Sequence, residues 1–120
     1  MGQPVVHWEI ASRDAAAMRA FYQELFGWKV TVDETLNYGI VETGGEGGID
    51  GGIFPVPESS PTHLTFYVQV DDLDVSLHQA ETLGAKILVP PTPVPGVGAT
   101  ALFADPEGNT IGLFKAQTAS

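Results

Sequence analysis

Histidine and other polar side chains share one face of two short stretches that resemble β-strands. In residues 4–10, PVVHWEI, the two-residue alternation of a strand puts His7 and Glu9 on the same side. In residues 62–70, THLTFYVQV, the same alternation groups four side chains on one face: His63, Thr65, Tyr67 and Gln69. Imidazole and carboxylate groups placed in this way can bind a divalent metal, or they can line a polar site for a small molecule.

Three hypotheses follow from these residues. A metal centre needs three or four protein ligands with at least one open position, and His7 and His63 supply two, with Glu9 or Asp50 as a possible third. The second hypothesis is a metal-free site that binds a small molecule or catalyses a reaction without a metal. The third is that both histidines are only hydrogen-bonded residues on a half-buried sheet face.

The composition limits the classes of function. The 120 residues are 43% hydrophobic and 17% charged, as expected for one folded domain. The formal net charge of −10 repels phosphate backbones and anionic lipids, so we expect neither nucleic acid nor membrane partners. The chain has no cysteine, which excludes disulfides and thiolate chemistry. No secretory signal or membrane-spanning run is visible, so a cytoplasmic protein is expected.

The first half of the chain predicts a strand, a helix and three further strands. Ser12 or Asp14 caps the helix, and Gly27 ends it in a left-handed conformation. Its apolar residues fall at i, i+3, i+4 and i+7: Met18, Phe21, Tyr22 and Leu25. We expect a core in which the helix covers the sheet, formed by Trp8, Phe21, Tyr22, Leu25, Phe66 and Val68.

The second half repeats this plan. Asp71 or Asp72 caps a second helix that ends at Gly84, and a strand over 85–89 follows. Residues 90–98, PPTPVPGVG, predict a loop, and 99–115 predict a hairpin around the turn Asp105–Asn109. The chain therefore predicts a single α+β domain, residues 1–120, with two βαβββ repeats at about 4–56 and 62–115.

This plan resembles the vicinal oxygen chelate superfamily, which includes glyoxalases, extradiol dioxygenases and bleomycin resistance proteins. Four segments in the expected order carry the resemblance: FYQELFGWKV at 21–30, VDDLD at 70–74, GAKILVPP at 84–91 and FADPEGNTIGLF at 103–114. The resemblance implies a curved mixed sheet around a cleft, with the helices on its convex side. It also implies a small-molecule ligand and, for a single-module member, a homodimer.

The resemblance further implies where metal ligands would lie. His7 stands at the first-strand ligand position, and Thr65 stands at its equivalent in the second repeat. Gly112 stands where the metal enzymes carry a glutamate, and Gly51 and Gly52 offer no carboxylate on the matching strand. We therefore expect no bound metal and a polar small-molecule cleft, lined by His7, Glu9, His63, Thr65, Tyr67, Gln69 and Gly112. The alternative is a divalent-metal-dependent lyase or dioxygenase that uses His7 and His63.

Overall fold

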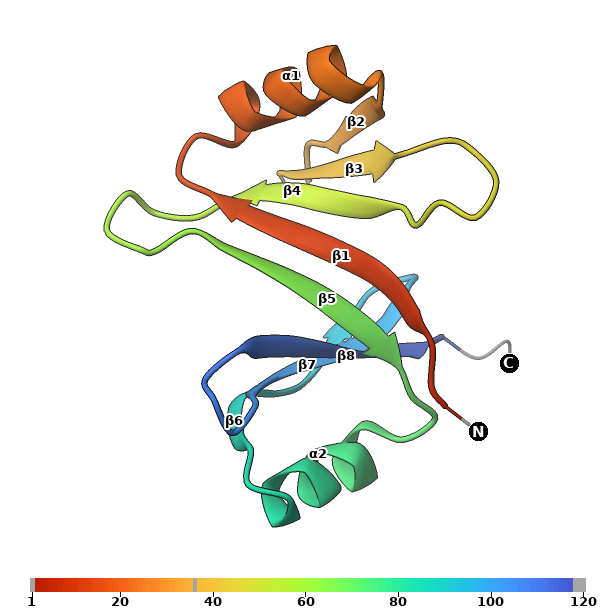
Figure 1. The fold of residues 1–120 in the computed structure, drawn as a ribbon, viewed down its shortest axis with the longest axis vertical. Coiled ribbons are helices and arrows are strands. Elements are labelled where there is room, and N and C mark those ends of the chain that lie inside the picture. The colour runs from red at the N-terminus through yellow and green to blue at the C-terminus, as the bar shows by residue number, and fades with distance from the viewer. Residues whose placement is uncertain (1, 36, 118–120) are drawn as a thin grey trace. The chain divides into compact units, whose positions relative to one another are not determined.

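The computed structural model describes residues 2–35 and 37–117 and contains two helices and eight strands (Figure 1). Their order along the chain is β1 (Val5–Ser12), α1 (Ala15–Phe26), β2 (Lys29–Asp33), β3 (Tyr38–Glu42), β4 (Gly51–Pro55), β5 (His63–Gln69), α2 (Leu73–Thr82), β6 (Lys86–Val94), β7 (Gly98–Ala104) and β8 (Thr110–Ala116). The chain forms two compact units. We call residues 7–65 the N-terminal unit, and residues 2–6 with 66–117 the C-terminal unit.

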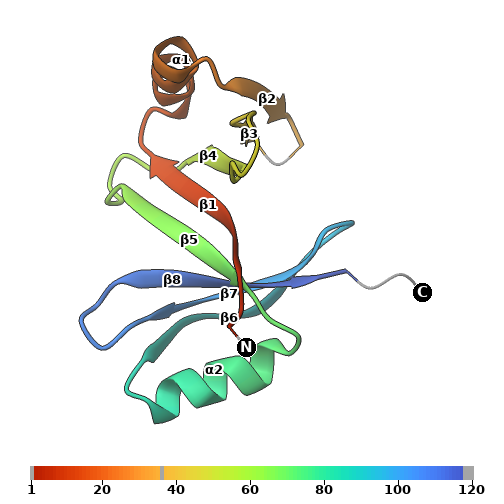
Figure 2. The same cartoon turned by 45° about the vertical axis from the view of Figure 1, so that its right-hand side comes forward.

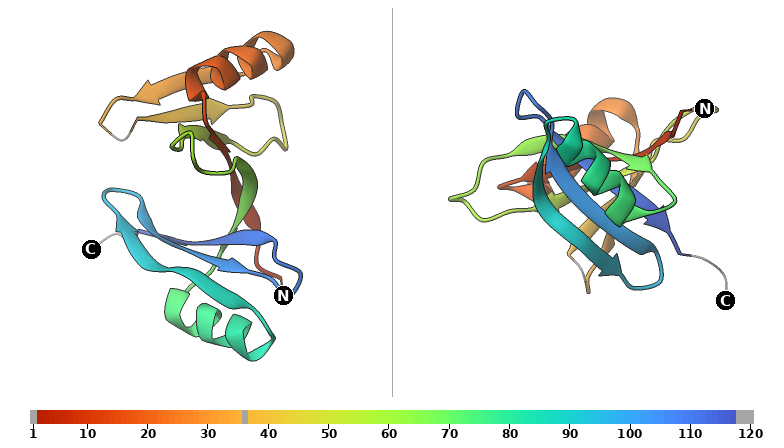
Figure 3. Two further views of the ribbon diagram at one scale, coloured as in Figure 1. Left: turned by 90° about the vertical axis from the view of Figure 1, so that its left-hand side faces the viewer. Right: turned by 90° about the horizontal axis from the view of Figure 1, so that it is seen from below.

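The N-terminal unit is a four-stranded mixed sheet with one helix. The strand order is β2-β3-β4-β1, in which β1 and β4 are parallel and the other pairs antiparallel. Helix α1 lies along one face of this sheet, as Figures 1 and 3 show. Val41 and Ile53 are fully buried beneath the helix and form the centre of the core. The opposite sheet face carries His7 and is described below.

Helix α1 begins and ends where the sequence predicts, but it is rotated from the predicted orientation. The Asp14 carboxylate caps it by accepting from the Ala17 N–H, and Gly27 ends it at φ 71°. Its sheet-facing side carries Ala15, Met18 and Tyr22.

The expected burial of Phe21 and Leu25 is therefore wrong, because these side chains are 51% and 58% exposed. A stripe at helical spacing fixes which residues share a side of the helix. It does not fix how that side is turned against the sheet.

The C-terminal unit has the same plan with strand order β5-β8-β7-β6, in which β5 and β8 are parallel. Asp72 caps α2, and the helix lies against the sheet (Figures 2 and 3). Leu73 and Leu77 of α2 are buried with residues from three neighbouring segments: Val70, Ala101 and Leu113. Val68 packs against this cluster as predicted. Phe66 is 41% exposed, so its expected burial is wrong.

The proline-rich stretch 90–98 is only partly the predicted loop. Strand β6 continues through Pro90, Pro91 and Pro93 to Val94 and pairs with β7, with two irregularities in register. Proline cannot donate to a sheet ladder, but β6 stands at the edge of its sheet, where one side of the strand needs no partner. The chain then turns into β7.

The predicted hairpin is present in β7 and β8. The Asp105 carboxylate accepts from the backbone N–H of Glu107 and of Asn109, and Gly108 takes φ 92°. Together the elements confirm the α+β class and the two βαβββ modules. The repeat boundaries at 4–56 and 62–115 stay predictions. Within the described residues, neither helix is long and apolar enough to cross a membrane.

Candidate functional site

A hydrogen-bonded chain of three polar side chains lies on the sheet face of the N-terminal unit opposite α1. His7 Nε2 is 2.8 Å from the Tyr38 hydroxyl, and that hydroxyl donates to Glu9 Oε2 at 2.9 Å. His7 and Glu9 come from β1, whereas Tyr38 begins β3, 31 residues after His7. The side chain of His7 is 35% exposed and that of Glu9 is 17% exposed, so solvent and small molecules can reach both.

The direction of these hydrogen bonds defines the state of His7. Because the single hydroxyl hydrogen of Tyr38 goes to Glu9, the Tyr38 oxygen must accept from His7 Nε2–H. The lone pair of the neutral ring is then on Nδ1. Burial lowers the pKa of His7 below 6.5, while the nearby negative charges of Glu9 and Asp50 oppose that shift. His7 is therefore neutral near pH 7 and can accept a hydrogen bond or a proton at Nδ1.

Two consecutive glycines make room for two aromatic rings, one on each face of the sheet. A Cβ on Gly52 would lie 1.9 Å from the Tyr38 hydroxyl oxygen, so the ring of Tyr38 lies where any other residue would place its side chain. On the opposite face, a Cβ on Gly51 would lie 2.2 Å from Trp8 Cδ2. Trp8 is held there because its Nε1–H donates to the Ile49 carbonyl at 2.7 Å.

The sequence predicted His7 and Glu9 but missed Tyr38. Tyr38 is the first residue of a short strand, and its own neighbours give no chemical pattern. The one available signal was the Gly51-Gly52 pair, since glycine in a strand interior often marks the close approach of another group. His7 and Glu9 share one face, as strand alternation predicted, and the residue that bridges them is a tyrosine.

The other predicted site residues have varied environments. His63 is exposed at the start of β5, and Thr65 is 3% exposed, with a hydroxyl that has no hydrogen-bond partner among the described residues. Tyr67 is 7% exposed and its ring covers Gly112, where a Cβ would lie 2.4 Å from Tyr67 Cδ2. The single cleft that was expected to contain all seven residues stays a prediction.

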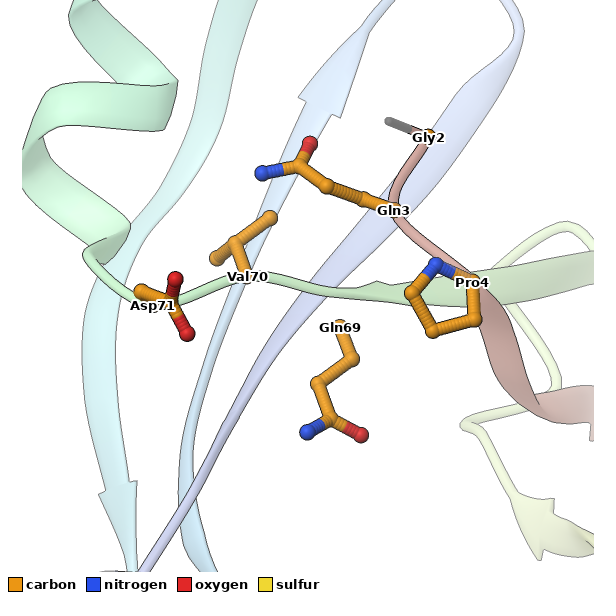
Figure 4. A pocket seen from close by; sticks show the side chains of 6 residues that line it. All are labelled: Gly2, Gln3, Pro4, Gln69, Val70 and Asp71. Atoms are coloured by element: carbon orange, nitrogen blue, oxygen red, sulfur yellow. The ribbon is translucent and has the colours of Figure 1, made fainter.

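Gln69 lies in the C-terminal unit, beside a small pocket of about 190 Å³ (Figure 4). The pocket is lined by Gly2, Gln3, Pro4, Gln69, Val70 and Asp71. The Gln69 N–H donates to the Pro4 carbonyl, which attaches the chain start to β5. In Figure 4 the Gln69 side chain leaves β5 on the opposite side from Val70, as strand alternation requires.

In the described ranges 2–35 and 37–117, no three His, Asp or Glu side chains lie close enough together to hold an ion. His7 Nε2 carries a hydrogen and is engaged with Tyr38, so that nitrogen cannot ligate a metal while the hydrogen bond is intact. Gly52 and Gly112, on the last strands of the two modules, are each covered by a tyrosine ring.

Residues 5–113 match the family model described as the glyoxalase/bleomycin resistance protein/dioxygenase superfamily. The chain belongs to this superfamily. Its two βαβββ modules are those of the glyoxalase superfamily, which confirms the resemblance to the vicinal oxygen chelate proteins.

Proteins with similar sequences include one from the genus Streptomyces. It is 28% identical over 123 residues to the anthracycline biosynthesis protein DnrV of Streptomyces peucetius, covering 89% of this chain and 45% of that protein. The chain thus spans less than half the length of this curated relative.

Among solved structures, a hypothetical protein from Bacillus halodurans superimposes with a TM-score of 0.72 at 14% identity, covering 100% of this chain and 99% of that one. The Mn(II)-bound glyoxalase from Novosphingobium aromaticivorans gives a TM-score of 0.68 at 17% identity, covering 98% and 42%. At these identities the two structures show a shared fold.

Proposed function

We propose that this chain is a small-molecule-binding member of the glyoxalase superfamily and that it lacks the complete metal site of the metal-dependent enzymes. The observation that carries the proposal is the hydrogen-bonded chain His7–Tyr38–Glu9 on an accessible sheet face. It offers a neutral imidazole and a carboxylate to a ligand, fixed in place by a tyrosine. Superfamily membership supports a small-molecule ligand.

The residues present do not fit a divalent ion. A metal at His7 would need either the loss of the Tyr38 hydrogen bond or ligation through Nδ1, together with further ligands. The two last-strand positions that could supply carboxylates are Gly52 and Gly112. Without carboxylates at those two positions, the site lacks the set of anionic oxygen ligands that a hard cation such as Mn²⁺ or Mg²⁺ requires.

The proposal is tested by metal binding. We expect protein purified without added metal to show no heat of binding for Mn²⁺, Ni²⁺ or Zn²⁺ that depends on His7, and no rise in melting temperature. An ion at 100 times its dissociation constant would stabilise the native state by about 2.7 kcal/mol, which is readily measured. His78→Ala, at an exposed position on α2, is the matched control for His7→Ala.

One stoichiometric ion that is lost in His7→Ala and kept in His78→Ala would contradict the proposal. The function would then be the metal-dependent lyase or dioxygenase that uses His7 and His63. Small-molecule binding is tested separately, by ligand-induced changes in the NMR signals of His7 and Tyr38.

We further propose a cytoplasmic homodimer. Exposed apolar side chains of α1 support self-association, because Phe21, Leu25 and Phe26 are each more than half exposed. Sedimentation at tens of micromolar tests it, since that concentration lies well above a dissociation constant of about 1 µM. A monomer under those conditions would contradict it.

A further inference from the structure

A second pocket of the C-terminal unit lies between α2 and its sheet, and its volume is about 320 Å³. Its floor is the helix-facing side of β5, β7 and β8, where four apolar side chains meet: Val68, Phe103, Ile111 and Leu113. The strand register pairs Val68 with Leu113 and Phe103 with Ile111. Side chains paired in this way on one face of a sheet contact each other, so they form one apolar surface.

The pocket lies where α2 carries small side chains and α1 carries large ones. When the two helices are aligned on their capping aspartates, Ser76 of α2 corresponds to Met18 of α1, and Ala80 corresponds to Tyr22. Met18 and Tyr22 pack against the core of the N-terminal unit. Ser76 and Ala80 instead line the pocket. Space that side chains fill in one module is therefore left open in the other.

The lining of the pocket favours an uncharged ligand. The described residues that line it are all uncharged, although the chain as a whole has a net charge of −10. Gln3 and Gln79 are exposed lining residues whose amides can donate and accept hydrogen bonds. In Figure 4 the Gln3 side chain extends from the chain start toward Val70, which also lines the pocket. A charged group would lose hydration here without gaining a charged partner.

We propose that this pocket binds a small uncharged organic molecule, with its apolar body on the sheet and a hydroxyl or amide group toward Gln3 and Gln79. The volume of about 320 Å³ falls within the range of about 300–1,000 Å³ that is usual for ligand sites. At about 30 Å³ for each water molecule, it has room for about ten non-hydrogen atoms. This site shares no residue with the chain His7–Tyr38–Glu9 and goes beyond the function proposed for it.

Three probes of matched size and shape separate charge from apolar contact: 3-phenylpropan-1-ol (neutral), 3-phenylpropanoate (an anion) and 3-phenylpropylammonium (a cation). NMR titration of the isotope-labelled full chain, at about 0.15 M salt to screen distant charges, gives their affinities and locates them. We expect the alcohol to bind with a dissociation constant of about 1 mM or lower and to shift the amide signals of Val68, Ser76 and Ala80. Both charged probes should bind at least about tenfold more weakly, because the pocket offers them no counter-charge.

Two variants of α2 fill the pocket with the side chains of α1. Ala80→Tyr and Ser76→Met should each weaken the alcohol at least about tenfold, and the melting temperature should stay unchanged or rise because a cavity is filled. His78→Tyr is the matched control, since it adds the same ring at an exposed position of α2 that does not line the pocket. Its affinity for the alcohol should equal that of the wild type. Circular dichroism checks folding, and Ser76→Met carries the test if Ala80→Tyr does not fold.

The other outcomes each overturn the inference. These are an affinity for the alcohol that is unchanged in both filling variants, an equal loss in His78→Tyr, and a charged probe that binds as tightly as the alcohol. If the filling variants dissociate a wild-type oligomer in sedimentation, a second copy of the chain covers the pocket instead. Binding of no probe overturns the inference and leaves the function proposed for His7–Tyr38–Glu9 standing. Signal shifts confined to His7 and Tyr38 overturn the inference and support that function.

Discussion

The two units differ in which strand supplies the ring that covers a glycine of the sheet. In each, a glycine on the last strand is covered by a tyrosine ring, Gly52 by Tyr38 and Gly112 by Tyr67. In the C-terminal unit the ring comes from β5, the strand paired with β8, and Tyr67 lies directly opposite Gly112. In the N-terminal unit the ring comes from β3, and the residue opposite Gly52 on β1 is Glu9.

The strand that supplies the ring decides what the first strand can carry. Where β5 itself supplies the tyrosine, the position opposite the glycine is taken by a buried aromatic ring. Where β3 supplies the ring instead, β1 can present polar side chains, and the tyrosine hydroxyl joins two of them. The two modules thus differ in which strand supplies the tyrosine ring, and with it in the side chains that surround the glycine.

The two helices differ in the size of the side chains that they bury, and this difference gives the largest predicted effect on stability. Helix α2 buries the large side chains of Leu73 and Leu77, whereas the buried residue of α1 is the small Ala15. Leu77→Ala should therefore lower the free energy of unfolding by about 3 kcal/mol, since it leaves a cavity in the core. Phe21→Ala, half exposed on α1, should change it by about 0.5 kcal/mol. Urea unfolding measures both, and equal losses would show that the two helices are anchored alike.

Gly112→Ala tests the buried ring of the C-terminal unit. The new methyl group would meet Cδ2, Cε2 and Cγ of Tyr67, and this ring has little room to move because it is 7% exposed. We expect a loss of about 2 kcal/mol, as for other overpacked cores. Gly2→Ala is the control, since its methyl meets nothing within 4 Å. A melting temperature like that of Gly2→Ala would mean that Tyr67 does not depend on the glycine.

Gly52→Ala should disrupt the hydrogen-bonded chain His7–Tyr38–Glu9 with only a small loss of stability. The atoms it meets are at the far end of Tyr38, which can swing away, so we expect a loss of only about 1 kcal/mol. The hydrogen bonds to His7 and Glu9 should be lost, and the NMR signal of the His7 Nε2–H should disappear or shift. Tyr38→Leu in the same chain should restore the stability. A Gly52→Ala protein with an unchanged His7 signal would contradict the ring placement.

The smallest expected effects are those of pH on stability, and the pH range differs between the two units. The folded pKa of His7 is lowered by burial, so the unfolded chain binds this proton more readily, and stability from His7 is lost as the pH falls below 6.5. Hydrogen bonds from Asn109 and from neighbouring backbone groups lower the pKa of Asp105, so its contribution is lost only below pH 3.8. NMR titration in the presence of a chelator follows both residues. A His7 that titrates above 6.5 would show that Glu9 and Asp50 outweigh burial.

Local signals made most of the fold predictable. Asp14, Gly27, Asp72 and the Asp105 turn act on neighbouring backbone, so their roles can be deduced from a few residues. The outward turn of Phe21 depends instead on how α1 meets a sheet formed by distant strands. Tyr38 could not be assigned from sequence for the same reason, because its position over Gly52 is a tertiary contact.

The three prolines of β6 have a consequence for how copies of this protein can meet. A sheet edge normally presents a row of backbone donors and acceptors, which invites a strand from another molecule and, at worst, fibrous aggregates. Pro90, Pro91 and Pro93 lack a backbone N–H, so this edge strand offers fewer donors to an incoming strand. We therefore expect any assembly of this chain to avoid continuous strand addition at β6, and we expect concentrated solutions to resist templated aggregation there.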